Sequence, residues 1–198
     1  MGRRVTNIVG MGQGEPFLNY RNVLAALRIL NDPQGLAIGA RHISISTCGV
    51  IEGIERFSHE PEQFTLAVSL HAARQSTRDL LMPRVARYKL PDLKQALMRY
   101  VKRTNRRVTL EYIMIDNVND TDRDLEALNA FCSDLLCHVN LIPINAVEGS
   151  PFQPSDPLVL DQWVQSIQSH GKEATVRDSR GSDIDGACGQ LKRTKCFT

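Results

Sequence analysis

The sequence lacks any hydrophobic stretch near the roughly 20 residues that a membrane-spanning helix needs. Its N-terminal segment, MGRRVTNIVG, also lacks the long apolar core and the small-residue cleavage site of a secretory signal peptide. These absences argue against a membrane protein and against export. We therefore expect a cytoplasmic protein without a membrane partner, and we expect it to be a monomer.

A strong excess of one charge is also lacking. The 24 Lys and Arg residues nearly balance the 22 Asp and Glu residues, which leaves a formal net charge of +2. This net charge is too small to indicate a nucleic-acid partner by itself. Basic residues do cluster at 102–107 (KRTNRR) and 192–195 (KRTK), but such clusters, taken alone, are more often solvated surface charges.

The five cysteines form neither a metal-site pattern nor a disulfide pattern. Their number is odd, and they are scattered along the chain. Only Cys132 and Cys137 are close in sequence, and their spacing is looser than that of typical zinc ligands. We interpret these two as buried small apolar residues. The sequence therefore predicts no metal site of its own.

Short β-branched runs alternate with amphipathic helical stretches along the whole chain. The expected strands lie near residues 5–9, 42–47, 64–70, 107–115, 138–144 and 174–177. Helices are expected to start near Asn19, Val50, Pro91 and Thr121, with a further helix around Leu160. This alternation predicts βαβ crossovers and a parallel sheet, and the apolar strands indicate burial on both faces. We expect one α/β domain with a curved, partly closed barrel, and a flat doubly wound sheet is the alternative.

Polar and glycine-rich segments follow the ends of these expected strands. They are 12–16 (GQGEP), 46–49 (STCG), 69–71 (SLH), 143–145 (PIN) and 180–190 (RGSDIDGACGQ). Each segment has a simpler explanation alone, because glycines after a strand make tight turns and strand-end histidines are more often structural. Parallel α/β proteins bind ligands at the carboxyl ends of their strands. The convergence of these segments on one rim therefore favours a binding site.

Six segments of the chain resemble the RlmN/Cfr family of radical S-adenosylmethionine (SAM) methyltransferases. They are GMGQGEPFLNYRNVLAALRIL, RHISISTCGV, LAVSLHA, RRVTLEYIMIDNVND, VNLIPINAVEGSP and RGSDIDGACGQL, in this order. The combination of the GEP turn with a terminal ACGQL is more specific than any single motif. The resemblance implies an enzyme that methylates adenine in ribosomal RNA and, for some members, in transfer RNA. It also implies a reducing electron-donor protein as a partner.

The resemblance implies roles for particular residues. Gly14 and Glu15 would bind the methionine amino group of SAM, and Cys188 would be the catalytic thiol, methylated first and then used to carry the carbon to carbon-2 of adenine. The other expected cofactor-contacting residues are Ser46, Ser69, Leu70, His71 and Asn145. The family generates its radical from a second SAM at a [4Fe–4S] cluster, so the cofactor supplies the difficult chemistry.

The resemblance ends before the motif that holds this cluster. The family uses CxxxCxxC upstream of the GEP strand, and the present sequence contains no such motif. We therefore expect residues 1–198 to form the C-terminal portion of a radical-SAM (β/α)6 barrel that lacks the first strand and the cluster loop. Two hypotheses stay open: an enzyme fragment that is inactive alone, or a protein that only binds SAM or RNA. Carbon-2 and carbon-8 methylation also stay open, because both subfamilies share these motifs.

Overall fold

The computed structural model describes residues 4–145 and 151–177. Its centre is a parallel sheet with the strand order β1-β2-β3-β4-β5-β6. The strands are β1 (Ile8–Gly10), β2 (Ile43–Thr47), β3 (Thr65–Ser69), β4 (Val108–Met114), β5 (Cys137–Pro143) and β6 (Glu173–Val176). Strands that are neighbours in the sequence are also neighbours in the sheet, as in a barrel. A doubly wound sheet would reverse its order part-way, so that alternative is excluded.

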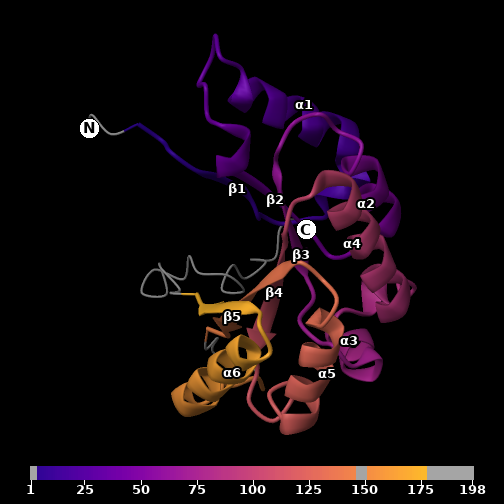
Figure 1. The fold of residues 1–198 in the computed structure, drawn as a ribbon, viewed down its shortest axis with the longest axis vertical. Coiled ribbons are helices and arrows are strands. Elements are labelled where there is room, and N and C mark those ends of the chain that lie inside the picture. Colours follow the sequence, from indigo (N-terminus) through magenta and orange to yellow (C-terminus); the bar gives the residue numbers. More distant parts are fainter. Residues whose placement is uncertain (1–3, 146–150, 178–198) are drawn as a thin grey trace, which may run out of the picture.

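The sheet is open, with β1 and β6 at its two edges. In Figure 1 the helices follow one side of the sheet, from α1 at the top, through α2 and α4, to α5 and α6 at the bottom. An open sheet with sequential parallel strands and helices on its outer side is a partial α/β barrel. This expectation from the sequence is confirmed.

The helices begin close to the expected positions, with one exception. They are α1 (Tyr20–Asn31), α2 (Ile51–Phe57), α3 (Gln75–Leu81), α4 (Leu90–Thr104), α5 (Asp122–Cys132) and α6 (Pro157–Ser169), together with the short 3-10 helices η1 (Pro16–Asn19), η2 (Ala40–His42) and η3 (Pro83–Val85). Pro91 lies in the first turn of α4, and Thr121 caps α5 through a reciprocal capping box with Asp124. Helix α3 is the element that the sequence did not lead us to expect.

The expectation of a sheet buried on both faces is confirmed at the centres of β3 and β4, where three successive residues are buried, but not along the other strands. Burial alternates along β2 and β5, because successive side chains of a strand point to opposite faces. Most apolar side chains pack under the helices, whereas the other face carries polar residues together with Ala67, Ile113 and Ile142. From β2 to β6 this inner polar face includes Ser46, Ser69, Glu111, Asn140 and Thr175. The strands thus present a polar surface toward the inside of the partial barrel.

The loop after β1 is anchored by close packing of Phe17 against α2. Phe17 is buried, and its ring centroid lies 5.6 Å from that of Phe57. A Cβ atom placed on Gly53 of α2 would lie 2.4 Å from Cδ2 of Phe17, so only glycine allows this approach. The packing fixes the segment that carries Glu15 and Pro16.

Two other expectations concern parts of the molecule away from the strand ends. Cys132 and Cys137 are buried, as expected for small apolar residues. Among the residues that the structure describes, no helix combines the length and the apolar character that crossing a membrane requires. Neither finding contradicts the sequence analysis.

Candidate active site

The Glu15 carboxylate joins the loop after β1 to the loop after β2. Oε1 accepts hydrogen bonds from the Phe17 amide (3.0 Å) and the Thr47 hydroxyl (2.9 Å), and Oε2 accepts one from the Cys48 amide (2.6 Å). Two carboxylate oxygens offer about four acceptor positions, so these three bonds leave little free capacity. Glu15 therefore has a structural function here that its expected role in binding SAM did not suggest.

Gly14, next to Glu15, is the exposed part of the same turn. Its φ of 105° lies in the left-handed region, which favours glycine, and a Cβ atom at this position would meet nothing within 4 Å. The backbone beside the carboxylate is therefore open to a ligand.

Ser46 and Ser69 lie side by side on the inner face, at the ends of β2 and β3. Their hydroxyl oxygens are 3.4 Å apart. Leu70 follows directly, but its side chain is fully buried, and its amide donates to the Glu111 carbonyl (3.0 Å). Any contact of Leu70 with a ligand is therefore restricted to its backbone.

His71 ends this segment in an unusual backbone conformation, with φ of 55°. Its Nδ1 atom accepts a hydrogen bond from the Ile113 amide (3.2 Å). Burial, and next the positive charge of Arg78, lower the pKa of His71 to about 4, so the imidazole is neutral near pH 7. Because Nδ1 is an acceptor, the ring proton resides on Nε2, which makes no hydrogen bond within residues 4–145 and 151–177. His71 is therefore a neutral donor at the strand ends.

The structure gives less information on the two remaining expected residues, Asn145 and Cys188. Asn145 is partly buried and lies two residues beyond the end of β5, at the same edge of the sheet. Cys188 lies outside the residues that the structure describes. The structure thus brings together the segments of Gly14, Glu15, Ser46, Ser69 and His71, while both the catalytic role of Cys188 and its place relative to them stay predictions.

Arg78 is a residue of the site that the sequence analysis missed. It belongs to α3 and is fully buried, and its Nη2 donates to the carbonyl oxygen of Cys48 (2.7 Å). Its Nε and Nη1 atoms have no partner in the described part of the chain. Buried N–H groups without partners are rare and costly. No pattern around QSTRDLL signalled a buried cation.

Glu111 was also missed, although the sequence held a signal for it. A carboxylate in the middle of the apolar run VTLEYIM is unusual in a buried strand. Burial raises the pKa of Glu111, and the hydrogen bond from Asn140 Nδ2 (2.9 Å) opposes this rise. Glu111 adds an acidic group to the inner face beside Ser69, its partner in the sheet register.

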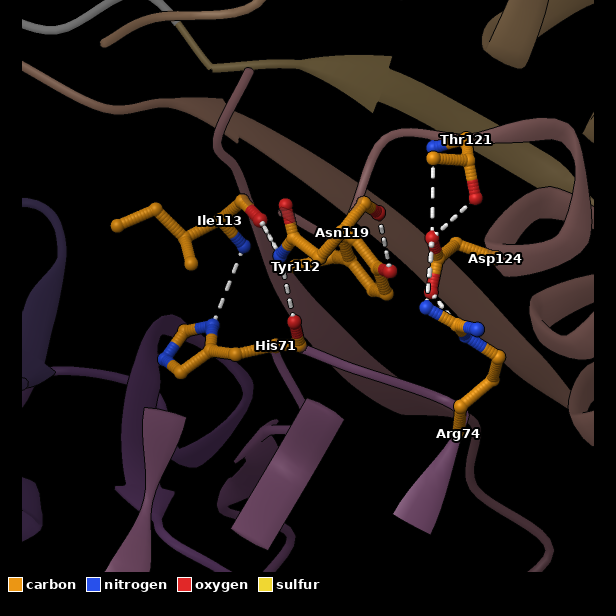
Figure 2. Close-up of polar contacts among 7 residues, drawn as sticks. All are labelled: His71, Arg74, Tyr112, Ile113, Asn119, Thr121 and Asp124. Carbon is orange, nitrogen blue, oxygen red and sulfur yellow. Dashed lines mark hydrogen bonds and ion pairs between the residues drawn. The ribbon is translucent and has the colours of Figure 1, made fainter. Parts of the chain in front are cut away.

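A third polar group, shown in Figure 2, fixes the loops after β3 and β4. Arg74 forms an ion pair with Asp124, with Nε 2.7 Å from Oδ1, and Asp124 also caps α5 with Thr121. Next to this pair, the buried side chain of Asn119 contacts His71 and Ile113. These contacts tie the His71 segment to the start of α5.

The described residues fit SAM better than they fit an iron–sulfur cluster. The free Nε2 of His71 and the open backbone at Gly14 are groups that a polar ligand can use, whereas the orphaned N–H groups of Arg78 are enclosed by the protein. For a cluster, by contrast, no three His, Cys, Asp or Glu side chains gather within residues 4–145 and 151–177. Burial, and next the Glu15 carboxylate, raise the pKa of the Cys48 thiol to about 11, so Cys48 is protonated rather than a ligand thiolate.

Comparisons with known proteins show which proteins this chain resembles. No family model matches the chain. A curated protein of Moorella thermoacetica, "Probable dual-specificity RNA methyltransferase RlmN", is 48% identical over 191 residues, which are 96% of this chain. Its counterpart in Clostridium perfringens is 42% identical over 194 residues, 98% of the chain. The chain is homologous to RlmN methyltransferases.

Solved structures agree with the homology to RlmN. A radical SAM methyltransferase from Sphaerobacter thermophilus superimposes with a TM-score of 0.92 at 47% identity and covers 96% of this chain. A domain of a pyruvate-formate lyase-activating enzyme from Bacteroides vulgatus shares the fold alone, with a TM-score of 0.63 at 15% identity. The chain spans about half the length of the RlmN relatives, 54% and 56% of the two proteins named above, and 55% of the Sphaerobacter chain.

Proposed function

We propose that this chain forms the substrate-facing part of a radical SAM enzyme that methylates carbon-2 of adenine in ribosomal and transfer RNA. The observation that carries the proposal is the homology to RlmN over 96–98% of the chain. The geometry supports it, because the GEP turn, the Ser46–Ser69 pair and His71 follow neighbouring parallel strands at one edge of the sheet. The proposal includes a cytoplasmic monomer and an electron-donor protein.

In this proposal the strand ends hold the methionine and ribose parts of SAM. The Gly14 backbone and the one remaining acceptor position of the Glu15 carboxylate accept hydrogen bonds from the ammonium group of SAM. Ser46 and Ser69 offer hydroxyls that both donate and accept, and His71 offers its Nε2 proton. Asn145 completes the set from the end of β5.

The first chemical step assigned to this chain is methylation of Cys188. The thiol loses its proton to solvent, and the thiolate sulfur attacks the methyl carbon of SAM. A carbon–sulfur bond forms to Cys188, the bond to the sulfonium breaks, and S-adenosylhomocysteine leaves with the electron pair. The [4Fe–4S] cluster would supply radical chemistry when bound. Its ligands are not among the described residues, and no step through it is derived from them.

The experiment that tests the proposal uses the complete protein that carries this chain. It is incubated with SAM that has a deuterated methyl group, a reductant, and ribosomal or transfer RNA, and the RNA nucleosides are analysed by mass spectrometry. We expect 2-methyladenosine that carries the label. In the Cys188→Ala variant the product should be absent. The matched variant Cys48→Ser should keep it, because hydroxyls and thiols both fit that turn.

Three outcomes of this experiment count against the proposal. Product from Cys188→Ala would remove this thiol from the reaction, and 8-methyladenosine would assign the protein to the carbon-8 subfamily. SAM binding without any methylated RNA would favour the non-catalytic hypothesis.

With the 198-residue chain alone, calorimetry should show weak SAM binding, on the order of millimolar, because the cluster normally chelates the methionine end of the ligand.

A further inference from the structure

Asn119 is a fully buried amide whose side chain donates two hydrogen bonds and accepts one. Nδ2 donates to the carbonyl oxygens of His71 (2.7 Å) and Ile113 (2.6 Å), and Oδ1 accepts from the Ile115 amide (2.8 Å). Its own carbonyl oxygen accepts a hydrogen bond from the Tyr112 hydroxyl (2.7 Å). The orientation of the amide is chemically determined, because a flipped group would place its oxygen against two carbonyl oxygens.

These side-chain bonds take the place of the backbone hydrogen bonds that a longer β3 would form with β4. The register between β3 and β4 ends at Ser69 and Glu111. In a parallel sheet every second residue directs its amide and carbonyl to the same neighbour, so Ile113 faces the place where β3 has already ended. There the His71 ring accepts from the Ile113 amide, and Asn119 donates to the Ile113 carbonyl, as Figure 2 shows. Together these two side chains complete the ladder.

The same bonds decide how His71 is presented. Its backbone has left-handed φ, which few residues other than glycine adopt, so the surrounding contacts must hold it. The His71 amide donates to the Glu111 carbonyl (3.1 Å), and Asn119 holds the His71 carbonyl. With Nδ1 bonded to the Ile113 amide, both the ring orientation and the tautomer are determined.

We propose that Asn119 is a positioning residue that holds His71 in the Nε2-protonated tautomer, with this proton directed to a hydrogen-bond acceptor of SAM. The identity of the ligand rests on the function proposed above. Both donors of the Asn119 amide are used and the residue is fully buried, so it is not available to a ligand. It acts through His71, which is 48 residues away in sequence.

The test compares Asn119→Asp with the matched variant Asn129→Asp in the complete protein. Aspartate keeps the acceptor for the Ile115 amide but loses both donors to the His71 and Ile113 carbonyls. Asn129 is an amide as well, but it is only part-buried and donates to Ser166 between α5 and α6, away from the strand ends. The histidines carry nitrogen-15, and NMR reports which ring nitrogen of His71 is protonated. Calorimetry measures the dissociation constant of SAM.

In the unchanged protein and in Asn129→Asp, we expect the Nε2 tautomer and the same affinity for SAM. In Asn119→Asp, the ring should exchange between tautomers or become protonated at neutral pH, and the affinity for SAM should fall about tenfold. An unaltered tautomer and affinity in Asn119→Asp would overturn the proposal. A proton on Nδ1 of the unchanged protein would also overturn it, even if the variant fails to fold. Absence of RNA methylation counts against the proposed function alone, because the tautomer does not depend on turnover.

Discussion

The close approach of Gly53 to Phe17 allows a quantitative prediction for Gly53→Ala. The new methyl group would lie 2.4 Å from Cδ2 of Phe17, whereas carbon atoms in contact are normally about 3.5–4.0 Å apart. The ring or the helix must therefore move by more than about 1 Å, and such overpacking costs about 1–3 kcal/mol. Alanine favours the helix by about 1 kcal/mol. Because three atoms of Phe17 lie within 2.5 Å of the new methyl group, we expect the upper part of the overpacking range and a net loss of about 1–2 kcal/mol in the free energy of unfolding.

Urea denaturation measures this loss, and Gly12→Ala is the matched control. A Cβ atom on Gly12 would meet nothing within 4 Å, so that variant should stay within about 0.5 kcal/mol of the unchanged chain. The displaced Phe17 follows Glu15 by two residues, so Gly53→Ala should also weaken SAM binding in the complete protein. If Gly53→Ala were as stable as Gly12→Ala, the inferred packing of the loop on α2 would be wrong.

Three further predictions concern buried polar groups. The pKa of His71 is about 4 in the folded chain and 6.5 in the unfolded chain, so between these pH values only the unfolded chain gains a proton. The free energy of unfolding should therefore fall by roughly 3 kcal/mol as the pH decreases from 6.5 to 4. His71→Gln should lack this part of the pH dependence in urea titrations. An unchanged pH dependence would show that His71 does not cause it. Arg78→Met removes the hydrogen bond to the Cys48 carbonyl, but it also removes two unpartnered buried nitrogens, so the free energy of unfolding should fall by only about 1 kcal/mol or less, whereas a loss above about 3 kcal/mol would show that these nitrogens have partners. Asp124→Asn breaks the ion pair with Arg74, whose side chain is 37% exposed and can still be solvated by water. The free energy of unfolding, measured by urea denaturation, should fall by about 1–3 kcal/mol, and a change near zero would show that the ion pair does not stabilise the fold.

The order of the strands could be predicted from the sequence because their apolar runs are long and well separated. Every expected strand overlaps an observed one. Helix α3 could not be predicted from the sequence, because its segment QSTRDLL is mostly polar and its buried residues are Thr77 and Arg78. Its place depends on the carbonyl of Cys48, a contact between residues 30 positions apart.

The candidate site was predictable only in part, for a similar reason. Polar residues at strand ends are visible in the sequence, and parallel strands bring them to one edge. The role of Asn119 was not visible, because the motif IDNVND reads as a polar turn. Its contact with His71 follows from where β3 stops relative to β4, and the register of the strands determines that point. The polar inner face was overlooked because apolar neighbours mask single residues such as Glu111.

The sequential strand order also affects how the molecule opens and how a ligand stabilises it. Among the strands that the structure describes, each pairs only with the strands before and after it in the chain, so the edge strands β1 and β6 can separate without disrupting the centre. Amide hydrogen exchange should therefore be fastest at these edges and slowest in β3, β4 and β5. A ligand that touches both the loop after β1 and the end of β5 links two parts of the sheet that otherwise open independently. Binding would then turn a series of local openings into one cooperative unfolding transition.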